Sequence, residues 1–203
     1  MWIKICGLTS PEAVTAALEH AVDALGFVFA ASVRRVTPAQ AAQLSRRARG
    51  RTACVAVMRQ PSQRLLDEVL AVFRPDVLQS DAADLATLRL PESLALLPVL
   101  RAAPADCAEL PPRLLFEGAN SGSGHTADWG AARALARRTQ LVLAGGLNPG
   151  NVGEAIAAVR PFGVDVSSGV EARPGVKSPA ALGDFVEAVR AAARATGTTG
   201  DSL

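Results

Sequence analysis

The chain has 203 residues, of which 49% are hydrophobic and 20% are charged, so it is long enough to bury one sizeable core in a single domain. Its formal net charge is only +2, and its arginines are spread along the sequence, which argues against a nucleic-acid-binding arm. No apolar run reaches the ~18 residues of a membrane span, so we expect no membrane segment.

The N-terminus and the cysteines indicate the cellular compartment. Residues 1–5 lack the basic region and apolar stretch of a signal peptide. Cys6, Cys54 and Cys107 are widely spaced and do not have metal-ligand spacing. We therefore expect a reduced, cytoplasmic protein without a metal site.

Short apolar segments alternate with helical segments along the whole chain. Several of the apolar segments are continuous runs, which is typical of strands buried on both faces. One candidate, Leu94–Leu100, is also rich in the helix formers Leu and Ala. In chain order, the strand candidates are Trp2–Cys6, Ala24–Phe29, Thr52–Met58, Val77–Gln79, Leu94–Leu100, Arg113–Phe116, Gln140–Ala144 and Val164–Ser167.

Helix start signals lie between these candidates. A capping hydroxyl precedes a first-turn proline at three places, Ser10-Pro11, Thr37-Pro38 and Ser178-Pro179. Asp128 is a candidate cap for a helix that runs on from Trp129. The segment after Arg101 is interrupted by prolines and predicts only a poor helix.

Repeated strand–helix units imply parallel strands joined by right-handed crossovers. Eight units of roughly 25 residues each predict an α/β fold, a single (β/α)8 TIM barrel with parallel strands. The alternative is a doubly wound open sheet, but the first strand is not followed by the G-x-G-x-x-G turn of a dinucleotide fold. We expect one barrel domain over residues 1–195 and a disordered C-terminal tail over residues 196–203.

Two glycine turns follow the last two strand candidates and give the strongest indication of function. The first contains Gly145 and Gly146, and the second contains Ser168 and Gly169. Glycines let backbone N–H groups approach an anion closely, and a helix N-terminus adds a favourable partial charge. On the last two strands of a (β/α)8 barrel, such turns form the usual phosphate site. We therefore predict that these four residues bind the phosphate of a phosphorylated small molecule.

The end of the first strand carries a candidate catalytic thiol, because barrel enzymes place reactive groups at the C-terminal ends of strands. Cys6 lies there, and Lys4 lies two residues earlier on the same face. An ammonium at that position is expected to lower the thiol pKa from its ordinary value of about 8.5. Lys4 also has a potential ion-pair partner in Asp165 on the eighth strand. An ordinary buried cysteine is the alternative interpretation.

Two further strand ends carry charged side chains. Arg34 lies in the loop after the second strand, and its guanidinium is able to bind a carboxylate; a solvated loop arginine is the alternative. Glu117 directly follows the sixth strand, where a catalytic acid would lie. Asp128 lies beyond the next loop and is more simply explained as a helix cap.

In five stretches the chain resembles the phosphoribosylanthranilate isomerase family. The matching stretches are Lys4–Thr9, Ala24–Phe29, Gly122–Gly124 with Asp128–Trp129, Ala144–Pro149 and Gly163–Glu171. The resemblance implies a (β/α)8 barrel that catalyses an Amadori rearrangement without a cofactor in tryptophan biosynthesis. The substrate would be N-(5-phosphoribosyl)anthranilate and the product 1-(2-carboxyphenylamino)-1-deoxyribulose 5-phosphate.

The resemblance also implies roles for individual residues. Cys6 matches the cysteine that acts as the family's general base, and Arg34 matches the arginine expected to hold the anthranilate carboxylate. The family's general acid is an aspartate at the end of strand six, so Glu117 is expected to take that role here. We assign Lys4 and Asp165 to the substrate-binding set.

The chain departs from the family at four places. The typical Leu-Leu-Asp of strand six reads Leu114-Leu115-Phe116-Glu117, the loop after it is shorter than in many relatives, and a lysine common after Gly-x-Gly is His125. The typical Gln-Leu-His-Gly after strand four reads Leu78–Asp81. These differences concern the acid more than the fold.

Two other functions remain open on the sequence alone. Another phosphosugar barrel enzyme, such as an epimerase, would share the phosphate site without requiring Cys6, Arg34 and Glu117. A non-catalytic phospholigand-binding relative would have lost the strand-six acid, and Phe116 supports that interpretation. In each case we expect a phosphorylated small molecule as partner, no nucleic acid or membrane, and a monomer or homodimer.

Overall fold

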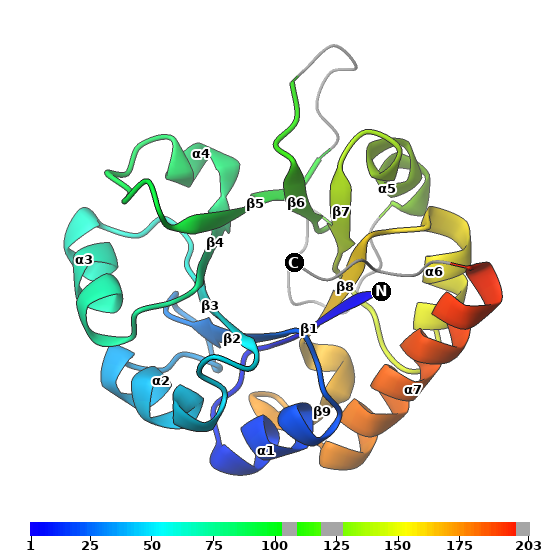
Figure 1. Cartoon of the computed structure of the whole chain (residues 1–203), viewed down its shortest axis with the longest axis horizontal. Helices are drawn as coiled ribbons and strands as arrows, with labels where there is room; N and C mark the ends of the chain where they lie inside the picture. Colours follow the sequence, from blue (N-terminus) through cyan, green and yellow to red (C-terminus); the bar gives the residue numbers. More distant parts are fainter. Residues whose placement is uncertain (103–108, 119–127, 198–203) are drawn as a thin grey trace.

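The computed structural model describes residues 1–102, 109–118 and 128–197. Eight parallel strands close into a barrel in which each strand pairs with the next along the chain and β8 pairs with β1. Figure 1 shows the strands as a central ring with the helices around it. The predicted (β/α)8 barrel is therefore confirmed, and the open-sheet alternative was wrong because no strand of the ring has a free edge.

All eight predicted strands are present, with shifts of one or two residues at their ends. The observed strands are β1 (Trp2–Cys6), β2 (Ala24–Val28), β3 (Ala53–Val57), β4 (Val77–Asp81), β5 (Ala95–Leu100), β6 (Arg113–Phe116), β7 (Gln140–Leu143) and β8 (Gly163–Val166). The segment with helix-forming residues is the strand β5, which pairs with β4 from Ala95 to Val99. Pro98 lies inside it, and a proline there would break a helix.

Four helices begin directly after the capping residues that the sequence predicted, Ser10, Thr37, Asp128 and Ser178. The helices are α1 (Pro11–Glu19), α2 (Pro38–Leu44), α3 (Gln63–Val72), α4 (Ala82–Leu85), α5 (Trp129–Ala136), α6 (Val152–Val159) and α7 (Pro179–Thr196), with short 3-10 turns at Ser45–Arg47 and Ser168–Val170. The Ser10, Thr37 and Ser178 side chains accept hydrogen bonds from first-turn N–H groups. Asp128 Oδ1 accepts from the N–H groups of Gly130 and Ala131 at 2.9 and 3.1 Å, which confirms its predicted capping role.

Three features near the chain's second half complete the fold. The poor helix predicted after Arg101 falls mostly on residues 103–108, which include Cys107 and lie outside the described residues; residues 101–102 and 109–112 form no helix. An antiparallel hairpin that the sequence did not predict, β9 (Glu171–Arg173) with β10 (Val176–Lys177), follows β8. The last helix extends through Thr196, one residue into the predicted tail, and the tail after residue 197 lies outside the described residues. No described helix is long and apolar enough to span a membrane.

The core has two layers, and they set which side chains face the cavity. The inner cluster lies within the barrel and contains Trp2, Ala24, Val55, Leu97, Val99, Leu115, Val142 and Ala144. The outer cluster, which includes Leu114 and Phe116, packs with the helices. Because side chains alternate along a strand, Glu117 shares the inward side of Leu115, and Cys6 shares that of Trp2. Phe116 therefore does not occupy the position of an inward-facing acid.

Candidate active site

A cavity of about 240 Å³ opens at the C-terminal ends of the barrel strands. Seven of the nine predicted site residues line it: Cys6, Arg34, Glu117, Gly145, Gly146, Asp165 and Ser168. Lys4 and Gly169 do not line it. The predicted site residues are thus brought to one place by the barrel, even though they span most of the chain.

The two glycine turns follow β7 and β8 and lie on one side of this cavity. Gly145 and Gly146 have φ values of +88° and +66°, which L side chains rarely adopt. Asn151 Nδ2 donates to the Gly146 carbonyl at 2.9 Å and fixes its direction. The N–H groups of Gly145, Gly146 and Ser168 donate no hydrogen bond to any described residue. These donors are therefore available to an anion.

Gly169 has a different role from the other residues of these turns. A Cβ at this position would overlap the carbonyl oxygen of Leu147, which directly follows the first turn. The absence of a side chain at Gly169 therefore allows the two turns to pack against each other. This contact holds them side by side at the cavity.

Cys6 lies next to a buried ion pair. Lys4 Nζ is 2.8 Å from Asp165 Oδ1, and the Lys4 side chain is 0% exposed. Burial opposes the charge on Lys4, but Asp165 outweighs this effect and raises the pKa of Lys4. Lys4 is thus a buried cation paired with Asp165. It does not line the cavity itself, but its neighbours Asp165 and Cys6 do.

Lys4 lowers the pKa of the Cys6 thiol, as predicted, but the net pKa of the thiol is raised. Burial raises the pKa of the Cys6 thiol, and the Lys4 ammonium offsets this only in part. The reason is that desolvation disfavours a thiolate more than one already paired ammonium favours it. Cys6 is therefore a thiol at neutral pH in the protein without ligand.

The side of the cavity formed by the ends of β4, β5 and β6 carries an arginine between two carboxylates. Arg101 Nη1 is 3.1 Å from Glu117 Oε2, and Arg101 Nη2 is 2.9 Å from Asp81 Oδ1. These residues follow or end β5, β6 and β4, which are neighbours in the barrel. Glu117 is 16% exposed and lines the cavity, whereas Asp128 is exposed and caps α5 away from it. This arrangement favours Glu117 over Asp128 as the acid.

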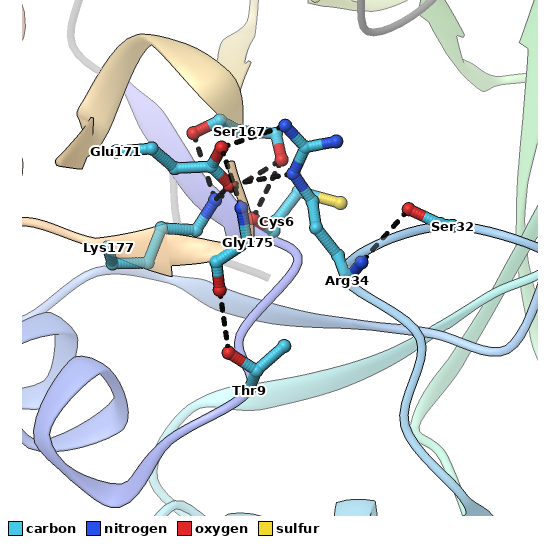
Figure 2. Close-up of polar contacts among 8 residues, drawn as sticks. All are labelled: Cys6, Thr9, Ser32, Arg34, Ser167, Glu171, Gly175 and Lys177. Atoms are coloured by element: carbon cyan, nitrogen blue, oxygen red, sulfur yellow. Dashed lines mark hydrogen bonds and ion pairs between the residues drawn. The ribbon is translucent and has the colours of Figure 1, made fainter. Parts of the chain in front are cut away.

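Arg34 reaches the cavity from the loop after β2. Its Nε and Nη2 atoms bind Glu171 at 2.6 and 2.8 Å, and Figure 2 shows the two side chains facing each other beside Cys6. The guanidinium is 15% exposed and lines the cavity. The solvated alternative was therefore wrong.

Sequence reasoning missed several residues of the site. Gly26 pairs with Cys6 across β1 and β2, and a Cβ there would lie 3.0 Å from Cys6 Sγ and 3.2 Å from Lys4 Cε. Gln79 lines the cavity at 5% exposure, and its Oε1 has no hydrogen-bond partner among the described residues. Both lie inside strand segments that the sequence did identify. The pairing of Gly26 with Cys6 and of Gln79 with Val57 places them next to other site residues, and this pairing was not predicted. Arg101 and Glu171 were missed because their partners lie far along the chain.

The fold and this site define a class of protein: a (β/α)8-barrel enzyme with two glycine turns whose N–H donors no described residue uses, and with a carboxyl group and a thiol at its mouth. The comparisons with known proteins are more specific. Residues 3–188 match the family model described as N-(5'phosphoribosyl)anthranilate (PRA) isomerase. The chain belongs to this family.

Individual relatives cover nearly the whole chain. It is 39% identical over 212 residues to the N-(5'-phosphoribosyl)anthranilate isomerase of Mesorhizobium japonicum, covering 94% of this chain and 95% of that one. The crystal structure of phosphoribosyl anthranilate isomerase from Thermus thermophilus matches with a TM-score of 0.81 at 28% identity, covering 94% and 99%. A phosphoribosyl anthranilate isomerase in complex with reduced 1-(o-carboxyphenylamino)-1-deoxyribulose 5-phosphate matches with a TM-score of 0.77 at 29% identity, covering 94% and 99%.

Proposed function

We propose that this protein catalyses the Amadori rearrangement of N-(5-phosphoribosyl)anthranilate to 1-(2-carboxyphenylamino)-1-deoxyribulose 5-phosphate in tryptophan biosynthesis. The observation that carries the proposal is the order of groups around one cavity. The strands β7 and β8, with the anion-binding turns, lie between β6, which carries Glu117, and β1, which carries Cys6. A sugar anchored by its phosphate between them has an acid on one side and a thiol on the other.

The first step needs an acid. Glu117 protonates the furanose ring oxygen, the C1–O bond breaks, and the nitrogen lone pair forms a Schiff base at C1. Arg101 binds Glu117 in the structure, so a proton transfer from Glu117 requires that contact to weaken when the substrate enters. Positioned proton transfer of this kind contributes about 10²–10⁴-fold to a rate.

The second step needs a base. The Cys6 thiol first loses its own proton to water, and the resulting thiolate removes the proton from C2. The electron pair of the C2–H bond forms a C1–C2 double bond, and the Schiff base nitrogen becomes neutral. The enolamine then tautomerises to the ketone by gaining a proton at C1 and losing one from the C2 hydroxyl, so no atom is gained or lost overall. The cationic Schiff base brings a positive charge near Cys6 and favours the thiolate at the step that uses it.

The remaining residues bind and orient the substrate. The N–H groups of Gly145, Gly146 and Ser168 would hold the phosphate, and their lack of a partner among the described residues supports this role, with Gly169 supporting the turn. Arg34 would bind the anthranilate carboxylate. Asp165 lines the cavity and also holds Lys4, so the pair fixes the surroundings of Cys6. Remote binding energy of this kind holds the reacting atoms in position.

The proposal includes the setting of the enzyme. We expect a cytoplasmic protein that is a monomer or a homodimer, and that needs no cofactor or metal. Light scattering of the purified chain measures its mass and so distinguishes a monomer from a homodimer. Activity after dialysis against a chelator tests the metal requirement.

A turnover assay on N-(5-phosphoribosyl)anthranilate, followed by the loss of its fluorescence, tests the proposed function. Turnover supports the isomerase. Binding of the product analogue without turnover would favour a non-catalytic phospholigand-binding protein. Epimerisation of a phosphosugar without turnover of the anthranilate substrate would favour the other enzyme class.

A further inference from the structure

One carboxylate beside the cavity has no task in the mechanism above. Glu171 Oε1 accepts hydrogen bonds from Arg34 Nε at 2.6 Å and Lys177 Nζ at 2.8 Å. Its Oε2 accepts from Arg34 Nη2 at 2.8 Å and from the Gly175 N–H at 3.2 Å. Figure 2 shows this carboxylate between the two cationic side chains. Its acceptor sites are thus filled by the protein itself.

Glu171 and Lys177 are too buried to contact a ligand. Their side chains are 4% and 0% exposed, and neither lines the cavity. Lys177 Nζ also donates hydrogen bonds to the carbonyl and hydroxyl oxygens of Ser167, at 2.9 and 3.2 Å. Both residues therefore act on other side chains, and the charged one of these that lines the cavity is Arg34.

Glu171 occupies one edge of the Arg34 guanidinium and leaves the other edge open. A guanidinium carries five N–H donors in a planar fork. Glu171 takes donors from Nε and Nη2, and no hydrogen bond to a described residue uses Nη1. Since Arg34 lines the cavity, its Nη1–Nη2 edge is able to bind a second carboxylate with two parallel hydrogen bonds.

We propose that Glu171 is a positioning residue for carboxylate recognition: it orients Arg34 so that the open edge of the guanidinium faces the cavity. This inference rests on the proposed function, in which Arg34 binds the anthranilate carboxylate. The two cations and the single carboxylate of this cluster leave one net positive charge. One positive charge suits a ligand with one carboxylate at this end.

The β9–β10 hairpin, which carries Glu171 and Lys177, also connects Arg34 to the rest of the site. Ser167, which Lys177 holds, donates from Oγ to the Cys6 carbonyl at 3.1 Å and directly precedes Ser168 of the anion-binding turn. Thr9 Oγ1 donates to the Gly175 carbonyl at 2.9 Å (Figure 2). The β9–β10 hairpin therefore fixes the carboxylate-binding group relative to the phosphate turn and the base strand.

Positioning and simple charge predict opposite results when Glu171 is neutralised. Glu171→Gln removes a negative charge near the ligand, so charge alone would strengthen the binding of a carboxylate. If Glu171 acts by orienting Arg34, the same change releases a long side chain beside a like-charged lysine and weakens that binding. The sign of the change thus separates the two explanations.

The test compares two ligands by isothermal titration calorimetry. One is the reduced product analogue, and the other is its counterpart without the ring carboxylate. In the wild type we expect the carboxylate to improve affinity, and Arg34→Ala to remove that preference. Glu171→Gln should reduce the preference about tenfold while the affinity for the counterpart stays unchanged. Adding Glu171→Gln to Arg34→Ala should change nothing further.

The controls separate this inference from the proposed function and from misfolding. Glu187→Gln, on the exposed face of α7, should keep the wild-type preference. Glu171→Asp keeps the charge but shortens the side chain, so it should also lose the preference even if Glu171→Gln folds poorly. A wild type without turnover or preference for the carboxylate would contradict the proposed function. A preference lost in Arg34→Ala but kept or increased in Glu171→Gln would overturn the positioning role alone.

Discussion

The two sides of the cavity mouth are held in different ways. On the base side, Lys4 and Glu171 are 0% and 4% exposed, and ion pairs or hydrogen bonds connect them to groups around Cys6 and Arg34. On the acid side, Asp81, Arg101 and Glu117 are 22%, 24% and 16% exposed and form one chain of ion pairs at the rim. Partly exposed pairs are individually weak, whereas buried ones resist change.

This difference matches the pattern of the sequence. The family-like motifs are strongest on the base side, and the departures fall on the acid side. We interpret the base side as a fixed framework in which Cys6 and Arg34 have one position each. The acid side can rearrange, and replacing an aspartate by the longer Glu117 is easier to accommodate there. The predictions below test this contrast.

The largest effect is expected at the centre of the base side. Cys6→Ala should lower kcat by about 10²–10⁴-fold because the proton acceptor is lost, while thermal unfolding changes little. Alkylation should inactivate the wild type, and the product analogue should protect it. Cys54 is the matched control, because it is also a buried strand thiol, with a pKa raised to about 11 by burial, but it belongs to the outer core layer. Near-normal turnover by Cys6→Ala would reject the role of Cys6.

On the acid side, Glu117→Gln should lower kcat by about 10²-fold or more, because the amide keeps the shape but does not donate a proton as a carboxylic acid does. Steady-state kinetics and thermal unfolding measure the two effects separately. Asp128→Ala should instead cost roughly 1 kcal/mol of stability through the lost cap, with a smaller effect on turnover. A normal Glu117→Gln together with an inactive Asp128→Asn would reverse the assignment.

A substitution in the Gly145-Gly146 turn, between the two sides, should show a smaller effect, mainly on KM. Gly146 has a φ of +66°, so Gly146→Val strains the turn and shifts the N–H groups from the phosphate. We expect KM to rise roughly tenfold or more. In Gly153→Ala, the added Cβ meets only the Ala192 Cβ at 4.0 Å, so this variant should keep the wild-type KM. An unchanged KM in a well-folded Gly146→Val would remove the turn from the phosphate site.

The smallest effect is expected in the free energy of unfolding at low pH, through the ion pairs of Glu171. Burial of Glu171 opposes its ionisation, but hydrogen bonds from Arg34 and Lys177 outweigh this and lower its pKa from 4.5 to about 2. A lowered pKa means that the stabilisation is present above pH 4.5 and is lost as the pH falls toward 2. One such group changes the unfolding free energy by at most about 1.4 kcal/mol per pH unit. Denaturant titrations should show a shallower decline in Glu171→Gln than in Glu187→Gln, and equal slopes would show that Glu171 does not contribute.

The barrel could be predicted because its signals are local. Continuous apolar strands, capping residues before prolines and glycine turns after strands each depend on a few neighbouring residues. Cys6 and Glu117 could be placed at the mouth because alternation along a strand fixes the side of each side chain. The cap at Asp128 was also predictable, because capping depends only on the residues directly before and after the start of the helix.

The electrostatics of the site could not be predicted in this way. The pKa of Cys6 depends on how much water burial removes, and the spacing of Lys4 and Cys6 contains no information on that. The contacts of Arg34 with Glu171 and of Arg101 with Asp81 join residues 137 and 20 positions apart. Such pairs form only when the barrel closes and brings separate strand ends together.

The pH dependence of kcat/KM in wild type and Glu117→Gln tests the acid–base pair most directly. A rate that needs both a protonated general acid and a thiolate depends less steeply on pH than a rate that needs the thiolate alone. Glu117→Gln leaves only the thiolate requirement, and burial raises the pKa of Cys6 above its ordinary 9.0. Its kcat/KM should therefore rise about tenfold per pH unit between about pH 7 and pH 9. Parallel profiles for the two proteins would contradict the account.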